Sequence, residues 1–295
     1  MKKTTAILAA LALTLFSVNA WAQAPQKDNQ FLNHWSVGVG LLEDAHVQVA
    51  GTILPSLQVR VLYSTLSPYV AIADGITKNN PNVGGINPFR KTIPVNADLN
   101  GVKIDNLDLE AQLKSSELQL MLDFFPSQIS NFHFTGGLIV DFTPNILTAK
   151  LTPETNGQPA LKPAADGSGL VEFGGVSPDP NGDVNVWACY GTKKIRPYIG
   201  IGFGRAVDLE KRVHLTMDLG FAYIGGLHVF SEGYLQDWPN AKEVEITEEW
   251  CNNTKLPGGK TVTESVGART VEYVGMANSF PVLPYARLTL NVRLF

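Results

Sequence analysis

Apolar and polar residues alternate along much of the chain, and this period of two is typical of β-strands with two different faces. In residues 34–41, apolar side chains occupy the odd positions, whereas serine and glycine fill the even positions from 36 to 40. Comparable alternation marks the segments 46–54, 57–63, 107–124, 132–142, 199–204, 213–223 and 286–294. The sequence therefore predicts eight strands.

The two faces of these strands indicate the solvent around them. In a water-soluble sheet the apolar face packs on a core, but here the apolar faces are too numerous for one small interior. The opposite faces are crowded with Gly, Arg, Asp, His, Thr and Asn. A barrel with apolar residues toward lipid and polar residues toward a lumen accommodates both. We therefore predict an all-β protein, a transmembrane up-and-down antiparallel β-barrel of eight strands with long extracellular loops.

The lengths of the connections alternate, as they do in outer-membrane barrels. Long connections, rich in Asn, Gly and Pro, follow odd-numbered strands at about 66–105, 145–193 and 225–282. Short connections follow even-numbered strands at 55–56, 126–130 and 208–211. The connection after the first strand, 43–45, is short as well. If both chain ends lie in the periplasm, the long loops face outside; within the first of them, Tyr69–Ala73 is an alternative short strand.

One segment breaks the simple pattern. Between residues 107 and 124 the apolar positions are odd before Lys114 and even after Glu117. One extra residue in a β-bulge explains this change of parity, and so does a hairpin turn. We favour the bulge because it leaves the strand number even, as single-chain bacterial barrels require.

Charged residues and histidines lie on the faces that are predicted to point inward. Eight strands enclose a space just wide enough for side chains, and buried charges are tolerated when they pair and form hydrogen bonds. We therefore expect a polar, plugged lumen, with Asp108 and Glu110 among its acidic residues. The predicted lumen network comprises Arg60, Asp123, His133, Asp141, His214, Asp218, Arg287 and Arg293.

Aromatic residues near the strand ends predict girdles at the two membrane interfaces. The alternative is that they are ordinary aromatics on an exposed β surface. The residues concerned are Trp35, Tyr63, Phe124, Phe125, Tyr198 and Tyr223.

The first residues predict export. Lys2 and Lys3 precede the short apolar run 6–18, and A-x-A-like sites follow, so residues 1–22 are expected to be a cleaved signal peptide. The apolar run is too short for a membrane helix. Residues 23–33 then form a linker and 34–295 the barrel, in the outer membrane of a Gram-negative bacterium.

Charge and cysteine content narrow the function further. Without Lys2 and Lys3 the 23 basic residues become 21 against 27 acidic ones, a formal charge near −6, which argues against nucleic-acid binding. Cys189 and Cys251 lie in polar, loop-like stretches of an exported chain, so a disulfide is possible. The alternative is two unpaired thiols. Neither cysteine has His partners at metal-ligand spacing, and we expect no metal or cofactor.

Three stretches carry a resemblance to a known class. LEAQLKSSELQLMLDFFPSQISNFHFTGGL, RPYIGIGFGRAV and VHLTMDLGFAYIGG resemble the small outer-membrane β-barrels of the OmpA/OmpW-like class, without a peptidoglycan-binding domain. In that class a terminal Phe takes part in assembly recognition, which implies this role for Phe295. The apolar positions before Phe295 are offset by one from the usual signal. The implied partners are outer-membrane lipids, lipopolysaccharide and, through the C-terminal strand, the assembly machinery.

Candidate catalytic pairs fail on spacing. His133 and Asp141 are about 26 Å apart along an extended strand, and His214 and Asp218 about 13 Å, whereas a catalytic base needs contact within about 3 Å. We therefore predict no catalytic residue and no enzymatic activity. His34, His46 and His228 lie at strand ends or in loops and are expected to be exposed.

The function that follows is a non-enzymatic outer-membrane barrel with a structural or surface-binding role and an unknown external ligand. Three alternatives stay open from the sequence. They are a narrow porin-like channel, a soluble periplasmic barrel or sandwich, and a lipid-modifying enzyme.

Overall fold

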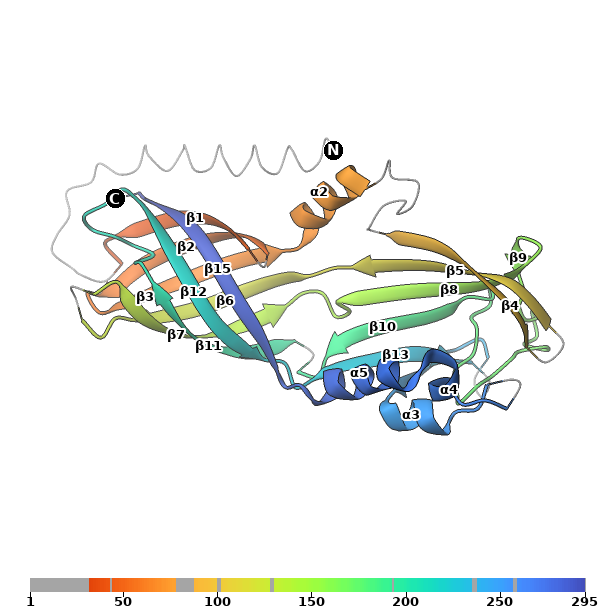
Figure 1. Ribbon diagram of the computed structural model, residues 1–295. Helices are drawn as coiled ribbons and strands as arrows, with labels where there is room; N and C mark the ends of the chain where they lie inside the picture. Colours follow the sequence, from red (N-terminus) through yellow and green to blue (C-terminus); the bar gives the residue numbers. More distant parts are fainter. Residues whose placement is uncertain are drawn as a thin grey trace.

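The computed structural model describes residues 32–42, 44–77, 88–99, 102–127, 130–192, 194–234, 238–256 and 259–294. The predicted signal peptide, most of the linker and Phe295 lie outside this part of the chain. The molecule is elongated, with a β-barrel at one end and a second, open sheet at the other (Figure 1).

Eight antiparallel strands close into the barrel in the order β1-β15-β12-β11-β7-β6-β3-β2. The predicted closed barrel of eight strands is thus confirmed. The strands are β1 (Trp35–Leu42), β2 (Ala45–Leu54), β3 (Leu57–Thr65), β6 (Ser116–Phe124), β7 (Phe132–Asp141), β11 (Ile195–Phe203), β12 (Val213–Tyr223) and β15 (Val282–Arg293).

Burial alternates residue by residue around the barrel, as the period of two predicts. In β12 every second side chain is buried and every other one is exposed. The exposed positions are aliphatic or aromatic, including Leu120 at 50% and Ile199 at 71% exposure. A surface of this composition fits hydrocarbon, and a closed sheet leaves no backbone group unpaired there. The barrel is therefore of the membrane-spanning, outer-membrane type, and the soluble alternative is not supported.

The two rims of the barrel differ. One rim, here called the turn rim, carries the start of β1, the end of β15 and the connections at 55–56, 125–131 and 204–212. The opposite rim, called the loop rim, carries the long connections 66–115, 142–194 and 224–281 together with the short turn between β1 and β2.

The three long connections contain regular structure, which corrects the expectation of irregular loops. They form a seven-stranded sheet in the order β14-β13-β10-β8-β5-β4, with β9 on β8. Its strands are β4 (Phe89–Leu99), β5 (Val102–Leu113), β8 (Leu147–Thr155), β9 (Gln158–Pro159), β10 (Val184–Tyr190), β13 (Leu227–Gly233) and β14 (Lys242–Ile246).

Within the described residues, four helices lie in the long connections: α2 (Ser67–Thr77), α3 (Glu248–Asn253), α4 (Val262–Val266) and α5 (Ala268–Ser279). The alternative strand at Tyr69–Ala73 is wrong, because these residues lie in α2. Two short helices begin at side-chain caps. Thr247 accepts a hydrogen bond from the Trp250 amide, and Thr261 forms a capping box with Glu264. Among the described helices, none has the length and hydropathy that a bilayer crossing demands.

The second sheet continues the wall of the barrel. The neighbouring barrel strands β6, β7, β11 and β12 lead into β5, β8, β10 and β13, which are neighbours in the same order. Hydrogen bonds bridge the junction: the Lys114 amide donates to Ile146 O and the Ile146 amide donates to Ala188 O, both at 2.9 Å. Half of the barrel wall therefore extends beyond the loop rim (Figure 1).

At this junction the apolar side chains move from the outer face of the wall to its inner face. Odd residues of β6, such as Glu117, point into the lumen, and its even residues face lipid. Backbone bonds of residues 114, 115 and 116 alternate between the two neighbouring strands, so no residue is inserted there. The odd residues of β5, Leu107 to Leu113, therefore lie on the lumen side, where Tyr190 also contacts the lumen residue Arg196 at 4.4 Å.

This geometry corrects the interpretation of the parity change. Neither a bulge nor a hairpin produces it, because the apolar residues move from the outer face of β6 to the inner face of β5. The reason is a change of solvent: apolar residues face outward against lipid and inward where water surrounds the wall. We therefore expect the membrane boundary on this strand to lie at Lys114 and Ser115.

The boundary predicts that a lysine on the outer face lowers the free energy of unfolding by different amounts on its two sides. Leu120→Lys places a charge in hydrocarbon near mid-strand and is expected to lower the free energy of unfolding by about 2–4 kcal/mol. Gln112→Lys, on the water side of the boundary, is expected to change it by less than about 0.5 kcal/mol. Urea unfolding in liposomes measures both variants, and equal costs would contradict the boundary.

Candidate functional site: the barrel lumen

At the turn rim, the connection between β11 and β12 folds into the barrel. Ala206 and Val207 are each 1% exposed. Gln58 holds Val207 by two hydrogen bonds, since its amide nitrogen donates to Val207 O at 2.7 Å and its oxygen accepts from the Val207 amide at 3.1 Å. Ser36 and His214 bond the Ala206 carbonyl. Backbone and side chains together fill this end of the lumen.

Above this turn lies a buried charged cluster. The Arg60 guanidinium is clamped between two carboxylates, with Nε 2.7 Å from Asp123 Oδ2 and Nη1 2.7 Å from Asp218 Oδ2. His133 Nε2 lies 2.9 Å from Asp218 Oδ1, and the Thr135 hydroxyl donates to Asp123 at 2.8 Å. Arg60, Asp123, His133 and Asp218 are each only 1% exposed, so each charge depends on its partner.

The same cluster has the composition of a metal site, because Asp123, His133 and Asp218 bring ligand atoms within 4.8 Å of one another. The Arg60 guanidinium already occupies the cationic position between the two carboxylates. An added cation would have to displace it or accept its repulsion. The cluster is therefore better described as an internal ion-pair network.

The next layer toward the loop rim is apolar. Met121 and Ile139 have 0% exposure, and Leu62 has 1%. The Arg287 guanidinium lies over two tyrosine rings, at 4.8 Å from that of Tyr285 and 5.4 Å from that of Tyr198. The apolar cluster comprises Leu62, Met121, Ile139, Tyr198, Ala222 and Tyr285.

A second charged cluster lies at the end of the lumen nearest the loop rim. Arg196, which is 1% exposed, donates to Glu117 Oε1 at 2.5 Å, to the Tyr285 hydroxyl at 2.7 Å and to Asp141 at 3.4 Å. The second sheet, which continues the barrel wall beyond the loop rim, is called the extension. Its Tyr190 ring covers the guanidinium of Arg196. The lumen and the extension therefore share this cluster.

On the β1–β2 side, an acid, a histidine and a hydroxyl form a chain. Asp44 Oδ1 lies 3.1 Å from His46 Nδ1, and His46 Nε2 lies 2.8 Å from Thr289 Oγ1. Burial acts to raise the pKa of Asp44, but the His46 hydrogen bond and the nearby Arg287 charge outweigh it, so the pKa lies below its usual value. The expectation that His46 is exposed is wrong, because it is 3% exposed and its ring points into the barrel.

Seven of the eight side chains predicted for the lumen network are buried, but they are divided among separate layers. The eighth, Arg293, is half-buried at the turn rim and donates to the carbonyls of Asp208 and Leu209. Asp108 and Glu110 are corrected as well. They lie on the outer face of the extension rather than in the lumen.

Sequence reasoning missed Glu117 and Arg196 because each lies at the edge of a segment whose strand boundary was misplaced. A usable signal was the row of inward glycines. Gly200 and Gly220 leave room for the Tyr198 hydroxyl, and Gly202 leaves room for His133. An inward glycine on one strand thus indicates a bulky lumen side chain beside it.

The aromatic residues divide between lipid and lumen. Tyr63, Phe124 and Tyr223 are 44–51% exposed on the outer face near the strand ends, as a girdle requires. Phe125 and Tyr198 are buried in the lumen, so their assignment to the girdles is wrong.

Both cysteines lie in regular structure, in β10 and α3, rather than in loops. The structure joins Cys189 and Cys251 by no disulfide bond, and the bond that the sequence allows stays a prediction. Burial raises the pKa of the Cys251 thiol.

Comparison with known proteins gives fold-level likeness only. No protein-family model and no curated protein matches the sequence. Among solved structures, CarO of Acinetobacter baumannii matches at 13% identity over 90% of this chain and 99% of that one, with a TM-score of 0.40. CarO2 of the same organism matches at 14% identity over 90% of this chain and 100% of that one, with a TM-score of 0.40. A major outer membrane protein of Thermus thermophilus matches at 13% identity over 88% of this chain and 98% of that one, with a TM-score of 0.39.

The charged cluster predicts a strong dependence on Arg60. Arg60→Met leaves two buried carboxylates facing each other and is expected to cost about 3–5 kcal/mol of unfolding free energy, measured by urea unfolding in liposomes. Adding Asp123→Asn and Asp218→Asn should recover most of this loss. Arg90→Met, which breaks an exposed pair with Glu110, is the control and should cost at most about 1 kcal/mol. A small cost at Arg60 would contradict the buried network.

Proposed function

We propose that the protein is a non-enzymatic outer-membrane barrel with a plugged lumen, whose functional surface is the sheet that extends beyond the loop rim. The observation that carries this proposal is the stack of four layers across the lumen. In each layer, side chains from several strands are at most 8% exposed. A solute would have to displace both ion-pair clusters and the apolar layer between them.

The extension suits an external role. The turn rim carries the start of β1 and the end of β15, and in barrels of this kind the short turns face the periplasm and the long connections face outside. The long connections here are built into a sheet with helices rather than left as irregular loops. A rigid scaffold of this kind positions binding groups better than irregular loops do. Outer-membrane lipids, and assembly machinery acting on Phe295, are the partners that we propose for the barrel itself.

The burial of the candidate nucleophile argues against enzymatic activity, because a substrate would have to reach it. Asp44, His46 and Thr289 stand in the order of an acid, a base and a nucleophile. Thr289, however, has 0% exposure and is enclosed in the lumen. A nucleophile must reach the substrate carbon at about 3 Å, and no acyl chain reaches Thr289 without unfolding the wall. We therefore assign this chain of groups to the support of the β1–β2 turn.

Hydrolysis assays test this assignment. The purified barrel, incubated with labelled phospholipid or lipopolysaccharide, is expected to release no product above that of the Thr289→Val variant, which removes the hydroxyl. Product release by the native chain that disappears in Thr289→Val and His46→Ala would overturn the non-enzymatic proposal.

Conductance tests the plugged lumen. In planar bilayers the native protein is expected to give no current steps, because a lumen plugged by the proposed layers would have no continuous water path. A known porin in the same bilayer is the positive control, and heat-modifiable gel mobility verifies that the inserted protein is folded. Regular, ion-selective steps from the folded native protein would favour the channel alternative instead.

A further inference from the structure

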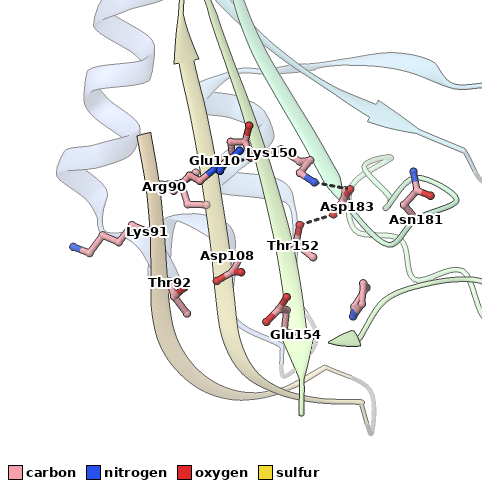
Figure 2. Close-up of a pocket in the computed structure, with 12 residues that line it drawn as sticks. Arg90, Lys91, Thr92, Asp108, Glu110, Lys150, Thr152, Glu154, Asn181 and Asp183 are labelled. Carbon is pink, nitrogen blue, oxygen red and sulfur yellow. Dashed lines mark hydrogen bonds and ion pairs between the residues drawn. The ribbon is translucent and has the colours of Figure 1, made fainter. Parts of the chain in front are cut away.

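The outer face of the extension carries two hollows that join into one groove. The larger, of about 500 Å³, lies over β4, β5 and β8 (Figure 2), and the smaller, of about 300 Å³, lies over β5, β8 and β10. They share Glu110 and Lys150, which are cross-strand partners. Both volumes fall in the range of small-molecule sites.

Some charged groups of the groove form ion pairs, and others have no such partner within the described residues. Arg90 pairs with Glu110 at 3.1 Å, and Lys150 pairs with Asp183 at 3.2 Å. Figure 2 shows Lys91 pointing away from the other labelled side chains. Asp108 Oδ1 is buried and accepts no hydrogen bond within the described part of the chain. The groove thus offers carboxylate acceptors, while Arg90 and Lys150 are already paired and Lys91 points away from the other labelled side chains (Figure 2).

The smaller hollow adds an aromatic platform. Trp187 lines it and stacks on Phe230, with ring centroids 6.1 Å apart and planes at 20°. Phe230 in turn stacks on His228 at 6.4 Å and 24°. This row braces the indole on the same outer face as Gln112 and Thr148, whose side chains both donate and accept hydrogen bonds. Polar groups therefore surround a flat apolar surface.

We propose that this groove binds an oligosaccharide through the hydroxyl groups of uncharged sugars. Sugar hydroxyls donate to the half-buried Asp108 carboxylate without adding negative charge, and the apolar face of a pyranose ring stacks on Trp187. A phosphate-rich or sulfated polymer is disfavoured, because Arg90 and Lys150 are already paired with carboxylates and Lys91 points away from the other labelled side chains (Figure 2). This proposal rests on the external placement of the extension and names the ligand class of that surface.

Two sources of such sugars are within reach. Gln112, Thr148 and Trp187 lie one to three residues beyond the barrel junction, about 3–10 Å along the strands, and Asp108 lies about 20 Å from Lys114. The groove therefore faces the sugar layer of the surrounding outer leaflet. Soluble or cell-bound glycans in the medium reach the same face.

Glycan binding by the full-length barrel in detergent tests the proposal. The probes are an array of neutral hexose and amino-sugar oligosaccharides, lipid-free core oligosaccharide released from lipopolysaccharide, a heparin fragment and spermine. Binding of the neutral array or of the core sugars is expected, and the set that binds identifies the source. Binding of neither set at millimolar concentration, or preferential binding of heparin or spermine, would overturn the proposal.

Variants on the groove and away from it locate the site. Trp187→Ala is expected to weaken binding about tenfold, because it removes the stacking surface. Asp108→Asn is expected to weaken binding about fivefold, because a neutral amide oxygen replaces a charged acceptor. Tyr273→Ala and Glu272→Gln, on α5, are matched exposed controls that should bind as the native chain does. Undiminished binding by both groove variants would contradict the site. Conductance is measured in a separate experiment, so a failure of the plugged-lumen proposal and a failure of the sugar-binding proposal can be told apart.

Discussion

The polarity of the environment outside the sheet determines this architecture. Over the barrel, every backbone group must be paired within the sheet because hydrocarbon offers no hydrogen bonds, and the outward side chains must be apolar. Beyond Lys114 and Ser115 the apolar residues of the same wall lie on the inner face, as we expect where the wall stands in water. One continuous set of strands thus satisfies two opposite solvents, and the change of face marks where the membrane ends.

The closed wall creates a second constraint inside. A barrel of eight strands is filled by its own side chains, so buried charges such as Arg60 and Arg196 need partners within the lumen. They find them on strands that are distant in sequence, and inward glycines make room for the largest rings. The apolar layer around Met121 separates the two ion-pair clusters. The lumen therefore resembles a core with polar layers.

The strand pattern was predictable because period-two alternation follows from strand geometry alone. The extension was not, for a physical reason. In β10, Val184, Val186 and Ala188 alternate with Asn185, Trp187 and Cys189, but the aromatic and sulfur side chains reduce the contrast between the faces. The parity change at Lys114 was visible, yet the sequence does not state the height at which lipid gives way to water.

The ion pairing inside the lumen could not be predicted from the sequence either. Arg60 and Asp218 are 158 residues apart, and only the closed strand order brings them together. The burial of His46 depends in the same way on its neighbours across β1 and β15.

Accessibility along residues 107–124 tests the exchange of faces most directly. Single spin labels at each position, on a Cys189→Ser, Cys251→Ser background, would be exposed to oxygen as a lipid-soluble relaxer and to a nickel chelate as a water-soluble one. Oxygen access is expected at even positions from 118 to 124, chelate access at even positions from 108 to 112, and little access to either at 119, 121 and 123. Chelate access at those odd positions, or the same relaxer dominating all even positions, would contradict the exchange of faces at the membrane boundary.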